Sequence, residues 1–149
     1  MEAVIREAVR ADLAGIKSCA IAAYTMYVER IGKKPAPMVA NFSEAIENKN
    51  LYVMEHAGQV CGFVVFYPCD DHVHLENVAV NPLFQRRGIG SRLIAFAEQR
   101  ARMAGYSRIE LYTNAMMTEN LQLYPRLGYE EFDRRLEDGF DRVYFRKAL

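Results

Sequence analysis

The fold prediction depends on one stretch of the sequence, Val78-Ala79-Val80-Asn81-Pro82-Leu83-Phe84-Gln85-Arg86-Arg87-Gly88-Ile89-Gly90. An apolar strand ends here, a short loop carries two arginines and two glycines, and a helix begins at once. Glycine lets the backbone approach a ligand closely, and the first-turn amides of a helix bind anions with the positive end of its dipole. The segment predicts a phosphate or pyrophosphate site. A plain strand-to-helix turn with solvated arginines is the structural alternative.

Two common nucleotide-binding motifs do not fit this loop. A dinucleotide fingerprint requires a third glycine where Leu93 stands. A Walker loop requires Gly-Lys-Ser or Gly-Lys-Thr, which the chain does not contain. The phosphate-bearing ligand is therefore of another kind.

Hydrophobic periodicity and turn residues outline the elements around this stretch. Asp12 is expected to cap the first helix. We expect strands over 4–9, 51–56, 59–67, 72–80, 107–113, 129–135 and 140–147, and helices over 13–30, 38–48, 88–104 and 117–127. This order predicts a mixed α/β chain with a largely antiparallel sheet and helices on both faces. The unit 72–113, strand then helix then strand, is the one expected parallel crossover.

Composition limits the class of protein. The chain has 149 residues, 51% of them hydrophobic, and 19 basic residues balance 19 acidic ones. This length predicts a single domain over 1–149. Zero net charge argues against a nucleic-acid partner. The absence of a signal peptide or long apolar run, and three cysteines without pairing motifs, predict a cytoplasmic protein with no membrane partner.

Two motifs resemble those of the GNAT family of N-acetyltransferases. Gln85-Arg86-Arg87-Gly88-Ile89-Gly90 is similar to the family signature Gln/Arg-x-x-Gly-x-Gly/Ala. About 30 residues downstream, the run from Asn120 to Tyr129 resembles its second signature, an Asn followed by a Tyr and a Gly-Tyr or Gly-Phe pair. The predicted element order also matches, so the resemblance covers nearly the whole chain.

The resemblance implies a GNAT fold and acetyl-coenzyme A as co-substrate. The fold is a mostly antiparallel, twisted sheet of about seven strands, in which the strand over 72–80 splays from the strand over 107–113. The residues implied to bind the cofactor are Val78, Ala79, Val80, Gln85, Arg86, Arg87, Gly88, Ile89, Gly90, Ser91, Asn120 and Tyr124. The family needs no metal. A metal site using His72 and His74 is the alternative to a polar turn followed by a strand.

Catalysis of acyl transfer to an amine requires a base, an acid and a polarised carbonyl. By the resemblance, Tyr124 is the acid for the leaving thiolate, with a packing tyrosine as the structural alternative, and the Val78 backbone N–H polarises the carbonyl. Strand alternation is expected to put His72, His74, Glu76 and Val78 on one face. Family members often have a Glu or His at the positions that match Glu76 and His74, so the resemblance implies Glu76 as the first candidate base and His74 as the reserve. The alternative is that both only line the cleft.

The acceptor is expected to be a primary amine on a small molecule or peptide. By the resemblance, its site would draw on Tyr24, Tyr27, Met38, Tyr112 and Asn114, although these residues also suit a seam between helix and sheet. A peptide or protein N-terminal acetyltransferase and a non-catalytic, coenzyme A-binding regulatory domain are the alternative functions. The acceptor's identity, the use of other acyl groups and a homodimer stay open.

Overall fold

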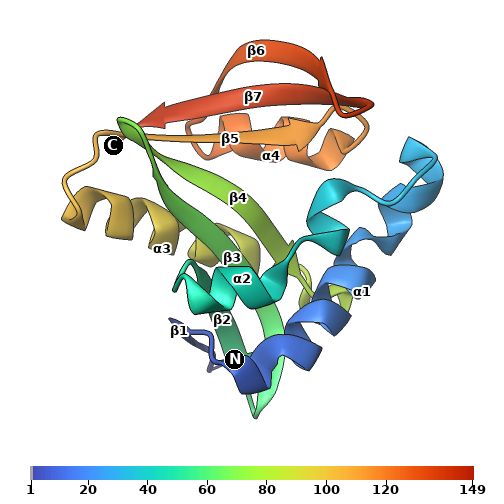
Figure 1. Cartoon of the computed structure of the whole chain (residues 1–149), viewed down its shortest axis with the longest axis vertical. Helices are drawn as coiled ribbons and strands as arrows, with labels where there is room; N and C mark the ends of the chain where they lie inside the picture. The colour runs from blue at the N-terminus through green and yellow to red at the C-terminus, as the bar shows by residue number, and fades with distance from the viewer. Residues whose placement is uncertain (1) are drawn as a thin grey trace.

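The computed structural model describes residues 2–149 (Figure 1). Seven strands and four α-helices follow one another with three short 3₁₀ turns, in an order that matches the predicted one. The strands are β1 (Val4–Glu7), β2 (Leu51–His56), β3 (Gln59–Cys69), β4 (His72–Val80), β5 (Arg108–Asn114), β6 (Glu130–Glu137) and β7 (Phe140–Ala148). The helices are α1 (Leu13–Ile31), α2 (Phe42–Glu47), α3 (Ile89–Met103) and α4 (Thr118–Arg126), and the 3₁₀ turns are η1 (Arg10–Asp12), η2 (Ala36–Val39) and η3 (Pro82–Phe84).

All seven strands form one sheet in the order β1-β2-β3-β4-β5-β7-β6. Every neighbouring pair is antiparallel except β4 and β5, which are parallel. Helix α3 makes the crossover between these two strands, as the sequence predicts, because parallel neighbours need a long connection. The sheet class and the single crossover are confirmed.

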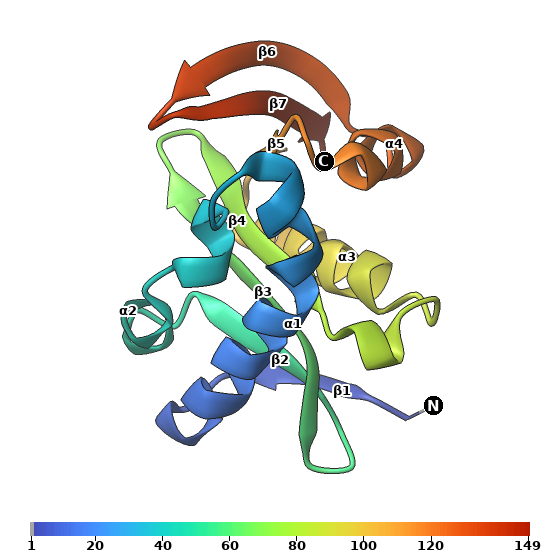
Figure 2. The same ribbon diagram turned by 90° about the vertical axis from the view of Figure 1, so that its right-hand side faces the viewer.

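Helices cover both faces of the sheet, and each face has its own apolar core (Figure 2). On one face α3 and α4 pack against side chains such as Val64, Val73 and Leu75. On the other, α1 and α2 pack against Leu51, Phe63 and Val65 with their neighbours. The alternation of these strand residues between the two clusters follows from the two-residue period of a strand.

Two local predictions are wrong. The predicted helix 38–48 is split into η2 and the short helix α2, because residue 40 is extended between them, with ψ near 160°. Asp12 makes no side-chain hydrogen bond at the start of α1. Its carboxylate instead accepts from the backbone N–H of Val9 at 2.8 Å and pairs with Arg6.

Candidate active site

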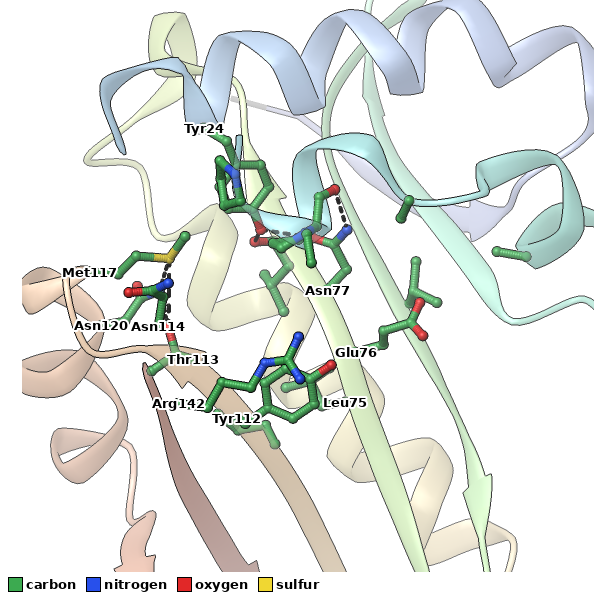
Figure 3. A pocket seen from close by; sticks show the side chains of 18 of the residues that line it. Tyr24, Leu75, Glu76, Asn77, Tyr112, Thr113, Asn114, Met117, Asn120 and Arg142 are labelled. Atoms are coloured by element: carbon green, nitrogen blue, oxygen red, sulfur yellow. Dashed lines mark hydrogen bonds between the residues drawn. The ribbon is translucent and has the colours of Figure 1, made fainter. Parts of the chain in front are cut away.

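The site begins where β4 and β5 separate. These strands are paired only through Val73 with Ile109 and His74 with Glu110. Beyond that point β4 continues for six residues without a sheet partner on its β5 side, and the two strands diverge toward α1 (Figure 3). The splay expected from the family resemblance is therefore present.

A β-bulge in β4 marks the same place. Val65 of β3 faces Asn77 and Phe66 faces Leu75, so Glu76 is the extra residue. A bulge of this kind shifts the alternation of side chains along its strand. Leu75 and Val78 consequently pack in the same core cluster, whereas Ala79 belongs to the opposite one. The predicted common face of His72, His74, Glu76 and Val78 is therefore wrong at Val78.

Asn77 fixes the bulge to the elements above it. Its buried amide donates to the carbonyl of Pro37 at 3.0 Å and accepts from the hydroxyl of Tyr24 at 2.7 Å. The Tyr24 hydroxyl also lies 2.9 Å from the carbonyl oxygen of Val78. Burial raises the pKa of Tyr24, which keeps this donor protonated. One amide thus ties the loop at Pro37, helix α1 and strand β4 together.

The backbone of β4 beyond the bulge presents unpaired donors to the splay. Asn81 N–H bonds to the carbonyl of Cys61 in β3, at 2.9 Å. In an antiparallel pair the hydrogen bonds to one neighbour come from every second residue. The N–H groups of Val78 and Val80, which alternate with those of Ala79 and Asn81, therefore point away from β3 and toward the space that β5 leaves.

A cavity of about 600 Å³ opens at the mouth of the splay (Figure 3). Its wall comes from α1, the segment from η2 to β2, strands β3 to β5, α4 and β7. The polar and aromatic residues that line it include Tyr24, Glu44, Tyr67, Glu76, Asn77, Tyr112, Asn114, Asn120, Tyr124, Phe140 and Arg142. A cavity of this size, with a few convergent polar groups, suits a small-molecule ligand.

Tyr124 reaches this cavity from α4. Its ring is buried and packs against the rings of Tyr129 and Phe145, with centroids 5.5 and 5.7 Å away. No group in residues 2–149 forms a hydrogen bond with its hydroxyl. Every fully buried side-chain oxygen in that range has a partner, so the Tyr124 hydroxyl is not fully buried. Because Tyr124 lines the cavity, its hydroxyl is open to it. Burial raises the pKa of Tyr124 above its ordinary value near 10. The hydroxyl therefore holds its proton at any physiological pH.

The two candidate bases occupy different surroundings. Glu76 is exposed at the bulge, lines the cavity and accepts from the hydroxyl of Tyr67 at 3.0 Å. His74 lies between the rings of Tyr67 and Tyr112, each 5.5 Å away, and is not among the residues that line the cavity. Burial lowers the pKa of His74 to about 4, so its ring is neutral near pH 7.

The residues predicted to bind phosphate, 85–91, follow the C-terminal end of β4 and do not line the cavity. Gly88 is left-handed, with φ of 72°, and precedes α3 without a side-chain cap from the described residues. Arg86 is left-handed as well, with φ of 65°. The amide of Arg92 bonds to the carbonyl of Gly88, at 3.0 Å, which leaves the first-turn amides before it without intrahelical acceptors. This backbone has the form of an anion site, with Arg86, Arg87 and Arg92 beside it.

The predicted acceptor residues separate into two groups. Tyr24, Tyr112 and Asn114 line the cavity. Tyr27 and Met38 do not: both pack in the core cluster under α1, and the Tyr27 hydroxyl lies 3.3 Å from Glu119.

Several residues of the cavity wall are not among the predicted site residues. Tyr67, Asn77, Phe140 and Arg142 all contribute to it. Arg142 carries no motif, and its place in the wall depends on the register between β5 and β7. Arg142 lies directly opposite Asn114, which was a predicted site residue.

Two further properties concern residues 2–149 as a whole. No three His, Cys, Asp or Glu side chains in this range come together in a way that could hold a metal ion. None of its helices has both the length and the apolar character needed to cross a membrane.

Comparison with known proteins fits this geometry. The model of the "Acetyltransferase (GNAT) family" matches residues 18–129. The chain belongs to the GNAT family. The PaiA N-acetyltransferase of Thermoplasma acidophilum, solved in complex with coenzyme A, has the same fold: the TM-score is 0.78 at 16% identity, with all of both chains covered. The N-acetylglutamate synthase of Neisseria gonorrhoeae, solved with coenzyme A and N-acetyl-glutamate, superposes with a TM-score of 0.78 at 19% identity; all of this chain and 35% of that one are covered.

Curated relatives of this GNAT chain match over shorter stretches. YjgM of Escherichia coli K12, an uncharacterised N-acetyltransferase, is 30% identical over 89 residues, which cover 57% of this chain and 53% of that protein. The aminoalkylphosphonate N-acetyltransferase of Salmonella typhimurium LT2 is 32% identical over 81 residues, covering 50% of this chain and 52% of that protein. The matches thus span about half of these relatives' length.

Proposed function

We propose that the chain is an acetyl-coenzyme A-dependent N-acetyltransferase that moves an acetyl group directly to the primary amine of a small molecule or peptide, with both substrates bound together. Membership of the GNAT family supports this reaction class. The observation that carries the proposal is the continuous path of donors along β4. It runs from the first-turn amides of α3, past the outward N–H groups of Val80 and Val78, to a cavity that holds the Tyr124 hydroxyl, which has no hydrogen-bond partner among residues 2–149.

The cofactor-binding residues in this proposal follow that path. The loop from Gln85 to Ser91 holds the pyrophosphate with its amides and the nearby guanidinium groups. Residues 78–80 offer backbone groups to the amides of the pantetheine arm, as an added strand would use them. Asn120, which lines the cavity and donates to Thr113 Oγ1 at 3.1 Å, stands at the thioester end with Tyr124.

The chemistry needs three groups near that end. The acetyl thioester supplies an activated carbonyl, and the N–H of Val78 donates to its oxygen as negative charge develops there. The hydrogen bond from Tyr24 to the Val78 carbonyl helps fix the backbone at this residue. A backbone N–H of β4 that has no strand partner thus polarises the thioester carbonyl.

In this proposal Glu76 is the base for the amine and Tyr124 is the acid for the leaving thiolate. A lysine-like ammonium has a pKa near 10.4, so removal of its proton at pH 7 costs about 4–5 kcal/mol. Glu76, directly or through water, takes one proton from the ammonium, and the neutral nitrogen then forms the bond to the acetyl carbon. The carbon–sulfur bond breaks, and the Tyr124 hydroxyl gives its proton to the leaving sulfur. The second proton that the nitrogen loses restores the Tyr124 hydroxyl. His74 is the reserve base, but its position between two rings and its lowered pKa favour a positioning role.

A thiol-release assay with acetyl-coenzyme A tests the proposal. The panel contains amino acids, polyamines, aminoglycosides and short peptides, and product masses are measured because the exposed thiol of Cys69 adds background. A mass gain of one acetyl group on one amine class is expected. Coenzyme A binding without acetylation of any amine would favour the regulatory-domain alternative and overturn the proposed activity.

A further inference from the structure

Arg142 gives the cavity a positive charge that the proposed reaction does not use. It extends from β7 across the face of Tyr112, with the guanidinium carbon 4.5 Å from the ring centroid and 5.7 Å from that of Phe140 (Figure 3). Its side chain is only 12% exposed. Contact with these two rings restricts the motion of the guanidinium, which lowers the entropic cost of binding through it.

The ion pairs of Arg142 leave most of its donors available. Asp138 Oδ2 at 3.4 Å and Glu137 Oε1 at 3.7 Å both approach the same nitrogen, Nη1. In the described part of the chain, Nε and Nη2 have no partner, and no fully buried side-chain nitrogen there is without one. These two nitrogens are therefore not fully buried, on a residue that lines the cavity. They form the fork that matches a carboxylate or phosphonate.

Glu76, on β4, adds the opposite charge to the same cavity (Figure 3). It is exposed at the β4 bulge, and only one of its oxygens is engaged within residues 2–149, by the hydroxyl of Tyr67. No ion pair joins Glu76 to Arg142 in that range. The cavity thus keeps a carboxylate and a guanidinium apart, each with free hydrogen-bonding capacity.

We propose that the acceptor is a small amine that carries its own acid group, such as an amino acid or an aminoalkylphosphonate. The amine faces Glu76 and the thioester, and the anionic group is held by the Nε–Nη2 fork of Arg142. This inference rests on the proposed function and names its substrate class. A diamine would use Glu44 and Glu76, which both line the cavity, but its second charge would meet Arg142. A peptide N-terminus has no acid group fixed beside its amine.

Equilibrium binding separates these acceptors without needing turnover. Isothermal titration of the coenzyme A-saturated protein compares alanine, β-alanine and glutamate with their carboxamides, and 2-aminoethylphosphonate with ethylamine. The pairs are measured at about pH 6.5, where the amines are protonated. A diamine and a peptide amide complete the set. We expect at least one acid-bearing amine to bind 10- to 100-fold more tightly than its neutral partner. A hydrogen-bonded pair of charged groups, here the acid and the guanidinium, contributes a difference of this size.

A matched pair of variants assigns the difference to Arg142. Arg142→Gln should erase the preference for the acid-bearing member, and Arg142→Lys should restore only part of it, because an ammonium lacks the fork. Arg135→Gln is the control. Arg135 lies opposite Arg142 in the β6–β7 hairpin, stacks on Tyr144 at 4.4 Å and pairs with Asp133, but it does not line the cavity. This control should keep the full preference.

The outcomes distinguish the inference from the proposed function. Equal affinity within every pair, tighter binding of the diamine or peptide amide, or binding of no acid-bearing amine overturns the inference. The wild-type comparison decides this even if Arg142→Gln does not fold. Acetylation of amines without any preference for an acid group supports the function and refutes the inference. Arg142-dependent binding without acetylation supports the acid site and refutes the function.

Discussion

Gly90 allows the anion site before α3 to be tested without knowing the acceptor. It is the second residue of the helix, and a Cβ added there would lie 3.6 Å from Val80 Cγ2, which is an ordinary contact. Its φ is not in the left-handed region. The series Gly90→Ala, Gly90→Gln and Gly90→Glu therefore adds first a methyl group, then bulk, then charge, on a backbone that accepts all three.

Stability and cofactor affinity should respond in opposite directions in this series. Replacing a helical glycine favours folding by about 0.5–1 kcal/mol, and an acidic group in the first turn adds about 0.3–1 kcal/mol through the helix dipole. For binding, a carboxylate about 5 Å from one phosphate charge costs about 3 kcal/mol at an effective dielectric of about 20. That energy corresponds to about 100-fold weaker binding of coenzyme A.

Isothermal titration gives the coenzyme A affinities, and urea unfolding gives the stabilities. The comparison of Gly90→Glu with Gly90→Gln isolates the charge, since the two side chains have nearly the same size. We expect Gly90→Ala to bind close to the wild-type affinity and Gly90→Glu to bind about 100-fold more weakly than Gly90→Gln. If Glu and Gln variants bind within threefold of each other, the pyrophosphate does not lie at this helix terminus.

Three further changes probe the rest of the site. Tyr124→Phe should lower kcat about 100-fold or more with an acceptor found in the panel. The coenzyme A affinity and the thermal midpoint should stay within error, because the hydroxyl has no partner in residues 2–149. An unchanged kcat would exclude Tyr124 as the acid. His74 has a folded-state pKa of about 4 against an ordinary value near 6.5, so the unfolded chain takes up a proton first as pH falls. The wild type should therefore lose about 2 kcal/mol more stability between pH 7 and pH 5 than His74→Gln, measured by urea unfolding, and parallel losses would show an ordinary histidine. Asn77→Ala removes both bonds of a buried amide and should lower the free energy of unfolding by about 2 kcal/mol; a change as small as that of the exposed control Asn48→Ala would contradict its anchoring role.

Regular elements could be predicted from the sequence because their signals are local. The strand 72–80 was predicted with the bounds of β4, and the helix 88–104 lies within one residue of α3 at each end. The apolar period sets both, and Gly105 marks the helix end. The helix predicted over 38–48 failed because apolar periodicity does not detect a short non-helical break. Residues 40 and 41 both lie outside the helical region and separate η2 from α2.

The cavity was predicted only in part, because its residues meet through tertiary contacts. Tyr24, Tyr112, Asn120 and Tyr124 were named from motif and region, and all four line it. Arg142 was not, since it lies in a strand with no motif. Its place depends on the register that pairs it with Asn114. Tyr27 was named with Tyr24 from the region that the family resemblance gives for the acceptor site, but its ring packs in the core cluster under α1.

The bulge at Glu76 explains why simple alternation failed at the proposed catalytic site. A strand with strict two-residue alternation would place Glu76 and Val78 on the same face, and the Asn77 side chain would then point to the other. The extra residue puts Glu76 and Asn77 next to each other on the α1 side. One side chain can then line the cavity while the other anchors α1 and the Pro37 loop. The same irregularity accompanies the end of pairing with β5, so the unpaired backbone donors begin where the candidate base stands. A regular strand would supply neither arrangement. The bulge therefore brings the candidate base, the anchoring amide and the unpaired backbone donors together at the point where β4 and β5 separate.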